Sequence, residues 1–182
     1  MIDWAGDPML RDFNLLVTTM RGSEPQACSE TWYLLGEAGD STSIVDKTGI
    51  SGLIAAKTAL SATEAIKKLR NLLKDRPSEF RYVLRMIPIQ EVVDSNIPAI
   101  VEAASRIAHQ ICKDETFRVT VEKRHTSISG SELIREVAAV VERQVSLTKP
   151  DKILLVQIVG GRTGVSIIDA SGVLSTHKER RL

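Results

Sequence analysis

One stretch, residues 116–169, constrains the fold most, because strand and helix signals alternate in it at short spacing. Its strand signals are β-branched or alternating runs at 116–124, 152–159 and 164–169. A capped helix is predicted between the first two, because Ser129 and Glu132 form a capping box and apolar residues follow at helical spacing as far as Val145. The second run is almost continuously apolar and indicates a central strand, and Gly160-Gly161 predicts a hairpin.

The first of these strands also suggests a binding surface. It places Phe117, Val119 and Val121 on one face and ends in three potential cations beside a Ser/Gly loop. The three cations are Lys123, Arg124 and His125. An apolar scaffold that carries a basic tip is a common way to hold a polyanion.

The N-terminal half shows a second regular order. Strand signals lie at 13–20, 41–47, 51–58 and 79–88. Capping-box patterns predict two helices among them, one starting at Ser23 with Gln26 and one at Ser61 with Glu64. The order is β-α-β-β-α-β, so we expect an α+β chain with a ferredoxin-like domain over 12–90. This fold hosts many unrelated functions, so it does not by itself indicate a ligand.

Three motifs in the C-terminal half carry a family resemblance. They are the strand FRV…EKR, the helix start SGSELI and the run VSLTKPDKILLVQI. In this order they resemble the THUMP domain, an RNA-binding module of tRNA-modifying proteins, and most closely the stand-alone THUMP proteins that assist tRNA cytidine acetylation. The resemblance implies an α-β-α-β-β THUMP domain over 91–170, with a helix capped by Ser95 or Asn96 at its start. The polar segment 171–182 is then expected to be a mobile basic tail.

Composition and motifs argue against several other classes of protein. The chain is 43% hydrophobic and 26% charged, as in ordinary globular proteins, and no apolar run reaches bilayer length. The N-terminus does not resemble a signal peptide, and Cys28 and Cys112 suggest neither a metal site nor a disulfide, so a cytoplasmic protein is expected. The histidines are dispersed, and no nucleotide, methyltransferase or hydrolase motif is found. We therefore expect no catalytic residue, metal or cofactor.

The distribution of charge indicates where an anion would bind. Residues 116–182 hold 11 Lys and Arg against 7 Asp and Glu, whereas residues 1–115 hold 13 against 16. Aromatic residues make up only 4% of the chain, which favours recognition of phosphates and shape over stacking of bases. The predicted RNA-binding residues are Arg118, Lys123, Arg124, His125, Arg135, Lys149, Arg162, Lys178, Arg180 and Arg181. A solvated charged face without a partner is the alternative at each position.

Three functions follow from these observations. The first is a tRNA-binding adaptor that presents tRNA to a modification enzyme; the resemblance implies an RNA cytidine acetyltransferase as the partner, with no membrane and no DNA involved. The second is a small RNA-modifying enzyme with an unrecognised site. The third is a protein-interaction scaffold that has no role on RNA.

Overall fold

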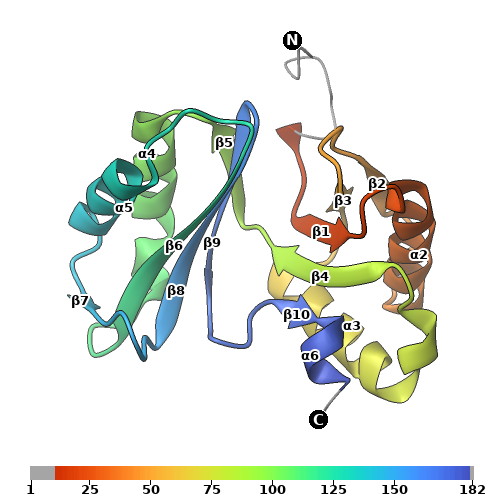
Figure 1. Cartoon of the computed structure of the whole chain (residues 1–182). Helices are drawn as coiled ribbons and strands as arrows, with labels where there is room; N and C mark the ends of the chain where they lie inside the picture. Colours follow the sequence, from red (N-terminus) through yellow and green to blue (C-terminus); the bar gives the residue numbers. More distant parts are fainter. Residues whose placement is uncertain (1–10, 181–182) are drawn as a thin grey trace. The chain divides into compact units, whose positions relative to one another are not determined.

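The computed structural model describes residues 11–180, which divide into two compact units. The N-terminal unit contains residues 11–89 and also residues 172–180, so the chain leaves this unit and later returns to it. The C-terminal unit is the segment 90–171. Each unit is a sheet with helices packed against it (Figure 1), and each has its own cluster of buried apolar residues.

The N-terminal unit is built on a five-stranded antiparallel sheet with the strand order β10-β4-β1-β3-β2. Its first elements are β1 (Leu15–Thr19), α2 (Glu24–Glu37), β2 (Ile44–Lys47), β3 (Leu53–Lys57), α3 (Ala62–Asp75), η2 (Pro77–Glu79) and β4 (Val83–Pro88). Leaving aside the short 3-10 helix, this is the β-α-β-β-α-β succession that the sequence predicts. Two further elements come from the end of the chain, β10 (Leu174–Ser175) and α6 (Thr176–Glu179).

Side chains alternate between the two faces of each strand, and those on one face form the core of this unit. Leu15 and Val17 are two residues apart on β1 and are both fully buried in one apolar cluster. The same cluster contains Leu34 of α2 and Leu69 of α3. Both helices therefore pack on the face of the sheet to which these β1 side chains point.

The helix caps of this unit follow the sequence prediction in one of two cases. The Ser61 hydroxyl accepts a hydrogen bond from the Glu64 N–H, as the capping box predicts. Ser23 makes no side-chain cap bond, so that prediction is wrong. The backbone of Ser23 is not in the extended conformation that directs a cap side chain toward the helix amides. The neighbouring Glu24 carboxylate instead binds backbone N–H groups of two loops, from Gly22 and Gly52.

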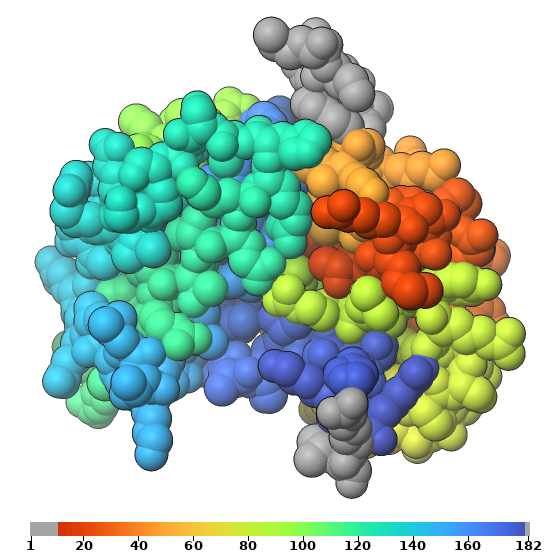
Figure 2. Space-filling view, viewed as in Figure 1, coloured from red at the N-terminus to blue at the C-terminus, as the bar shows by residue number. Residues whose placement is uncertain are grey.

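The prediction of a mobile tail is wrong for residues 174–180. Leu174 is fully buried opposite Met86 where β10 pairs with β4, and the Thr176 hydroxyl donates to the carbonyl of Val83 at 2.9 Å. Figure 2 shows the end of the described chain, in dark blue, against a yellow-green surface of the same unit. The Pro77 carbonyl accepts a hydrogen bond from the Arg180 guanidinium at 2.7 Å. The segment is polar in composition, but a single buried leucine and an added strand fix it to the N-terminal unit.

The C-terminal unit has a second five-stranded sheet, with the order β5-β9-β8-β6-β7. Strand β6 runs parallel to β7 and β8, and the pairs β8–β9 and β5–β9 are antiparallel. Its elements are β5 (Glu91–Asp94), α4 (Ile97–Ile107), η3 (Ala108–Gln110), β6 (Thr116–Arg124), α5 (Gly130–Ala139), β7 (Gln144–Val145), β8 (Lys152–Val159) and β9 (Arg162–Ile168). Helices α4 and α5 pack on one face, where Ile100, Leu133 and Phe117 share one buried cluster.

Two predictions for this unit need correction. The sequence predicts only a short connection after Pro88, marked by the acids Glu91 and Asp94, but Glu91–Asp94 form strand β5 and pair with β9. Helix α5 ends at Ala139 rather than near Val145. Val145 lies in β7 with its side chain 51% exposed, because the chain leaves the helix early enough to add an edge strand to β6.

Candidate nucleic-acid interface

One end of the C-terminal sheet gathers four of the predicted RNA-binding residues. The pairing register places Arg124 of β6 beside Val159 of β8, and Val159 beside Arg162 of β9. The Gly160 N–H donates to the Arg124 carbonyl at 2.9 Å, which joins the β8–β9 turn to the end of β6. Lys123, Arg124, His125 and Arg162 therefore lie along one end of this sheet.

Lys123 is placed at the start of helix α5. Its Nζ donates to the Ile128 carbonyl at 2.8 Å, and its stem passes within 4 Å of the position that a Cβ on Gly130 would take. The Ser129 hydroxyl accepts from the Glu132 N–H and caps the helix. A helix N-terminus carries a partial positive charge, so the exposed ammonium adds to a potential that already favours an anion.

Arg124 points to the other face of the sheet, because successive residues of a strand alternate. Its guanidinium lies 3.0 Å from the Glu122 carboxylate and 2.8 Å from the Gln157 side-chain oxygen. Its side chain is only 21% exposed. The Lys123–Arg124 pair that the sequence favours as a joint phosphate contact is therefore divided between two faces, and Arg124 is engaged within the fold.

His125 ends strand β6 in an uncommon backbone conformation. Its φ is +55°, which puts a residue other than glycine in the left-handed region. The side chain is exposed and forms no hydrogen bond or ion pair within residues 11–180. The turn directs the chain from the end of the sheet into residues 126–129, which lead to α5.

Arg162 and Arg135, the other two predicted arginines to be considered with this site, each form an ion pair with an acid. Arg162 lies 2.8 Å from Asp94 across the β5–β9 pair, and Arg162 is 25% exposed. Arg135, on α5, lies 3.3 Å from Glu136 and remains 72% exposed. The Arg135–Glu136 pair is open to solvent, and such pairs contribute little energy, so Arg135 remains available to a phosphate.

The remaining predicted cations lie elsewhere. Arg118 is six residues before Arg124 on β6, a distance of roughly 20 Å along an extended strand. Its guanidinium donates to the Leu147 carbonyl at 3.1 Å, and Lys149 is exposed in the same connection. Lys178 and Arg180 belong to the N-terminal unit, and Arg181 lies outside the described residues. The seven candidates of the C-terminal unit therefore do not form one surface.

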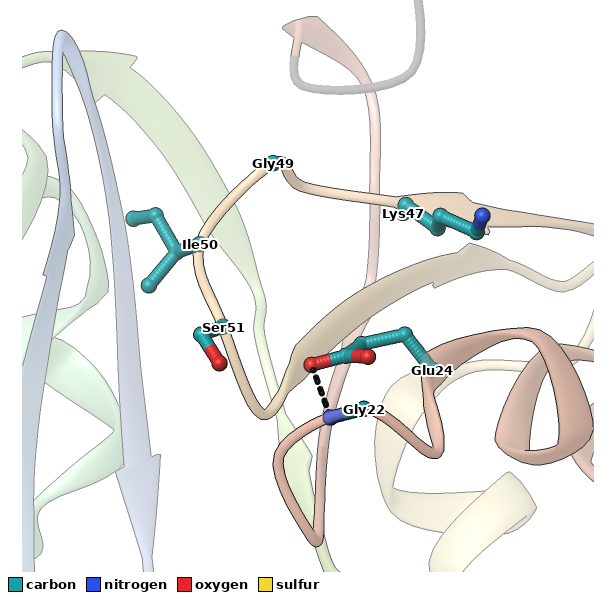
Figure 3. Close-up of a pocket in the computed structure, with 6 residues that line it drawn as sticks. All are labelled: Gly22, Glu24, Lys47, Gly49, Ile50 and Ser51. Carbon is teal, nitrogen blue, oxygen red and sulfur yellow. Dashed lines mark hydrogen bonds between the residues drawn. The ribbon is translucent and has the colours of Figure 1, made fainter.

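A pocket of about 340 Å³ in the N-terminal unit is a separate candidate, which the sequence did not indicate (Figure 3). It is lined by Gly22, Glu24, Lys47, Gly49, Ile50 and Ser51. The Glu24 carboxylate accepts hydrogen bonds from the Gly52 N–H at 2.6 Å and the Gly22 N–H at 3.2 Å. These hydrogen bonds lower the pKa of Glu24, and the bond from Gly52 has the largest effect. A carboxylate thus already occupies the amides that a phosphate would need, so the pocket does not suit an anion.

Within residues 11–180, no group of three or more His, Cys, Asp and Glu side chains is arranged to hold a metal ion. Over the same part of the chain, no helix combines the length and apolar character required to cross a bilayer.

One family model and several solved structures match this chain. Residues 94–168 match the family model of the THUMP domain. No curated protein sequence matches the chain. Among solved structures, TrmN from Thermus thermophilus is 17% identical with a TM-score of 0.56, over 86% of this chain and 45% of that one. PH1313 from Pyrococcus horikoshii is 13% identical with a TM-score of 0.59, over 90% and 55%.

A third similar structure is a 4-thiouridine synthetase in complex with RNA and ATP, 13% identical with a TM-score of 0.54. The match covers 90% of this chain and 42% of the synthetase. The chain thus spans about half the length of these proteins, and at such identities the likeness shows a shared fold. The family model by itself leads to the conclusion that this chain contains a THUMP domain, at residues 94–168.

Proposed function

We propose that this protein is a tRNA-binding adaptor that presents tRNA to a separate modification enzyme. The observation that carries the proposal is the THUMP domain at residues 94–168, the RNA-binding module that the sequence motifs resemble. The 4-thiouridine synthetase with a similar fold was solved with RNA, which supports RNA as the ligand. We place this role in the cytoplasm, and we take the N-terminal unit as the ferredoxin-like domain that accompanies such modules.

The end of the C-terminal sheet supplies the chemistry for phosphate binding. The Lys123 ammonium donates one hydrogen bond, to Ile128, and so keeps two of its three N–H groups for a ligand. His125 is exposed beside it, and the start of α5 adds a partial positive charge. Polar contacts of this kind position a folded RNA without reading its sequence, as expected for a chain with few aromatic residues.

The partner enzyme follows from the resemblance to stand-alone THUMP proteins. We propose an RNA cytidine acetyltransferase, with this chain contributing binding and orientation and the partner contributing covalent chemistry. Proteins of similar fold include one named as a 4-thiouridine synthetase, which supports a place in RNA modification. Holding a substrate in the correct orientation next to a catalytic group can supply a large part of a rate enhancement.

Acetylation assays test this role directly. Purified protein, an unmodified tRNA transcript and acetyl-CoA are combined with and without the acetyltransferase, and acetylcytidine is measured. The adaptor role predicts product only with the enzyme present, and more product when the adaptor is added. Product without the enzyme would favour a small RNA-modifying enzyme. Absence of tRNA binding at low salt, together with a stable protein complex, would favour the scaffold.

A further inference from the structure

Charge is distributed between the two units differently from the way it is distributed along the sequence. The N-terminal unit, residues 8–89 and 172–182, holds 14 Lys and Arg against 10 Asp and Glu, a formal charge of +4. Residues 90–171 hold 10 against 11, a charge of −1. The excess of positive charge that the sequence assigned to the C-terminal half therefore belongs to the other unit, since the described residues 174–180 fold back onto it.

Several acids of the N-terminal unit are directed into the fold. Glu30 accepts hydrogen bonds from three successive backbone N–H groups, those of Arg81, Tyr82 and Val83. Asp40 is 4% exposed and accepts from the hydroxyl and N–H of Thr42, the Thr58 hydroxyl and the Ala59 N–H. Glu24 is bound by loop amides as described above. The lysines and arginines of this unit therefore contribute more to its outer surface than the acids do.

Three exposed lysines, Lys67, Lys74 and Lys178, lie on the two helices α3 and α6, which one ion pair joins. Arg70 of α3 lies 2.9 Å from Glu179 of α6, and Figure 1 shows the two helices side by side. Lys67 and Lys74 lie three residues before and four after Arg70, so all three share one side of the helix. Lys178 precedes Glu179 on α6.

These three lysines are exposed, and none forms a hydrogen bond or ion pair in the described part of the chain. Asp75 is one position beyond Lys74 and so points about 100° away around the helix. Lys67 and Lys74 are about 10 Å apart along the helix axis, at 1.5 Å per residue. The three ammonium groups are therefore exposed on the two helices that the Arg70–Glu179 pair joins.

We infer that the α3–α6 surface, defined as Lys67, Lys74 and Lys178, is a second site for the phosphates of an RNA duplex. The inference takes the identity of the anion from the proposed tRNA binding, but the surface lies outside the THUMP domain. Ammonium groups on flexible stems bind phosphate as point charges and release its counterions, which gives affinity without sequence preference. The N-terminal unit thereby takes part in holding the RNA.

A triple variant, Lys67→Ala, Lys74→Ala and Lys178→Ala, tests this surface by gel-shift titration of an unmodified tRNA transcript at several salt concentrations. Removal of three phosphate contacts makes the slope of log affinity against log salt shallower by about 2 to 3 and weakens binding by about tenfold or more at moderate salt. Alanine is a strong helix former, so α3 is expected to remain folded, and a melting curve verifies this.

The matched control replaces Arg21, Lys47 and Lys113 by alanine. These side chains are also exposed and form no hydrogen bond or ion pair within residues 11–180, but they lie outside α3 and α6. The control removes the same formal charge, so an equal slope change in both triple variants would reduce the effect to net charge and overturn the site. An unchanged slope in the test variant would also overturn it. Failure of the unaltered protein to bind tRNA would instead overturn the proposed function.

Discussion

The guanidinium of Arg70 lies 2.9 Å from the carboxylate of Glu179, although 109 residues separate the two in the sequence. Arg70 belongs to α3, and Glu179 belongs to the last described helix, which reaches the N-terminal unit only after the whole C-terminal unit has been completed. The pair is about one fifth exposed on each side, so water screens it less than it would an open surface pair. It joins the two chain segments that form this unit.

The returning segment is expected to stabilise the N-terminal unit. Thr176 is 3% exposed, and its hydroxyl donates to the Val83 carbonyl at 2.9 Å. Thr176→Val keeps the shape but removes this donor, and we expect the free energy of unfolding to fall by about 1 to 3 kcal/mol. Urea unfolding followed by circular dichroism measures the change. Thr63→Val, at an exposed position of α3, is the control and should change the value by less than about 0.5 kcal/mol.

Ser61 and Ser23 each precede a helix of the N-terminal unit, so their alanine variants form a matched pair for testing the cap bond. Ser61→Ala removes a bond to the Glu64 N–H and is expected to cost about 1 kcal/mol of unfolding free energy. Ser23→Ala removes no cap bond and is expected to cost less than half as much. Both variants are measured in the same urea titration. Equal losses would show that the Ser23 side chain caps its helix in solution.

We expect the fold to lose stability at acid pH, because Asp40 stabilises it only as a charged carboxylate. Burial acts to raise its pKa, but hydrogen bonds from Thr58 and Thr42 outweigh that effect and hold the pKa well below the usual range. A lowered folded-state pKa means that the stabilisation is complete above the unfolded pKa near 3.9 and is lost as the pH falls below it.

Asp40→Asn tests this contribution, because the amide cannot accept all four hydrogen bonds and is neutral at every pH. We expect a loss of about 2 to 4 kcal/mol at pH 7 and a smaller difference from the unaltered protein at pH 3. Unfolding curves across this range measure it. The exposed carboxylate Asp46 serves as a control, and Asp46→Asn should show little difference at either pH.

Lys123 and Arg124 are adjacent in sequence but are expected to behave differently when replaced. Lys123→Ala removes an exposed ammonium and should weaken tRNA binding, with a salt slope shallower by about 1. Arg124→Ala removes the guanidinium that pairs with the Glu122 carboxylate and donates to the buried oxygen of Gln157. Its main effect should be a loss of stability of about 1 to 3 kcal/mol.

Gel-shift titrations and urea unfolding of both variants separate these effects. Lys113→Ala removes an exposed cation elsewhere in the same unit and controls for net charge. A larger change in salt slope for Arg124→Ala than for Lys123→Ala would contradict the assignment of Arg124 to an internal role.

Much of the fold could be predicted from local patterns. The capping boxes at Ser61 and Ser129 mark true helix starts, because a cap bond depends only on residues within one turn. The succession of strands and helices over residues 15–88 follows from apolar periodicity. Strand β5, the early end of α5 and the strand β10 were missed, because each depends on a partner strand that is distant in sequence.

The sequence by itself determined that this chain forms two α+β units, since periodicity, caps and turn residues act locally. Its motifs also resemble the THUMP domain, which the family model matches at residues 94–168. Only the tertiary structure decided which cations share a surface. Strand alternation separates Lys123 from Arg124, ion pairs engage Arg124 and Arg162, and the returning C-terminal segment carries Lys178 to helix α3. Charge along a chain is one-dimensional, whereas an electrostatic potential depends on distances in space, and those distances are set by long-range pairing and packing.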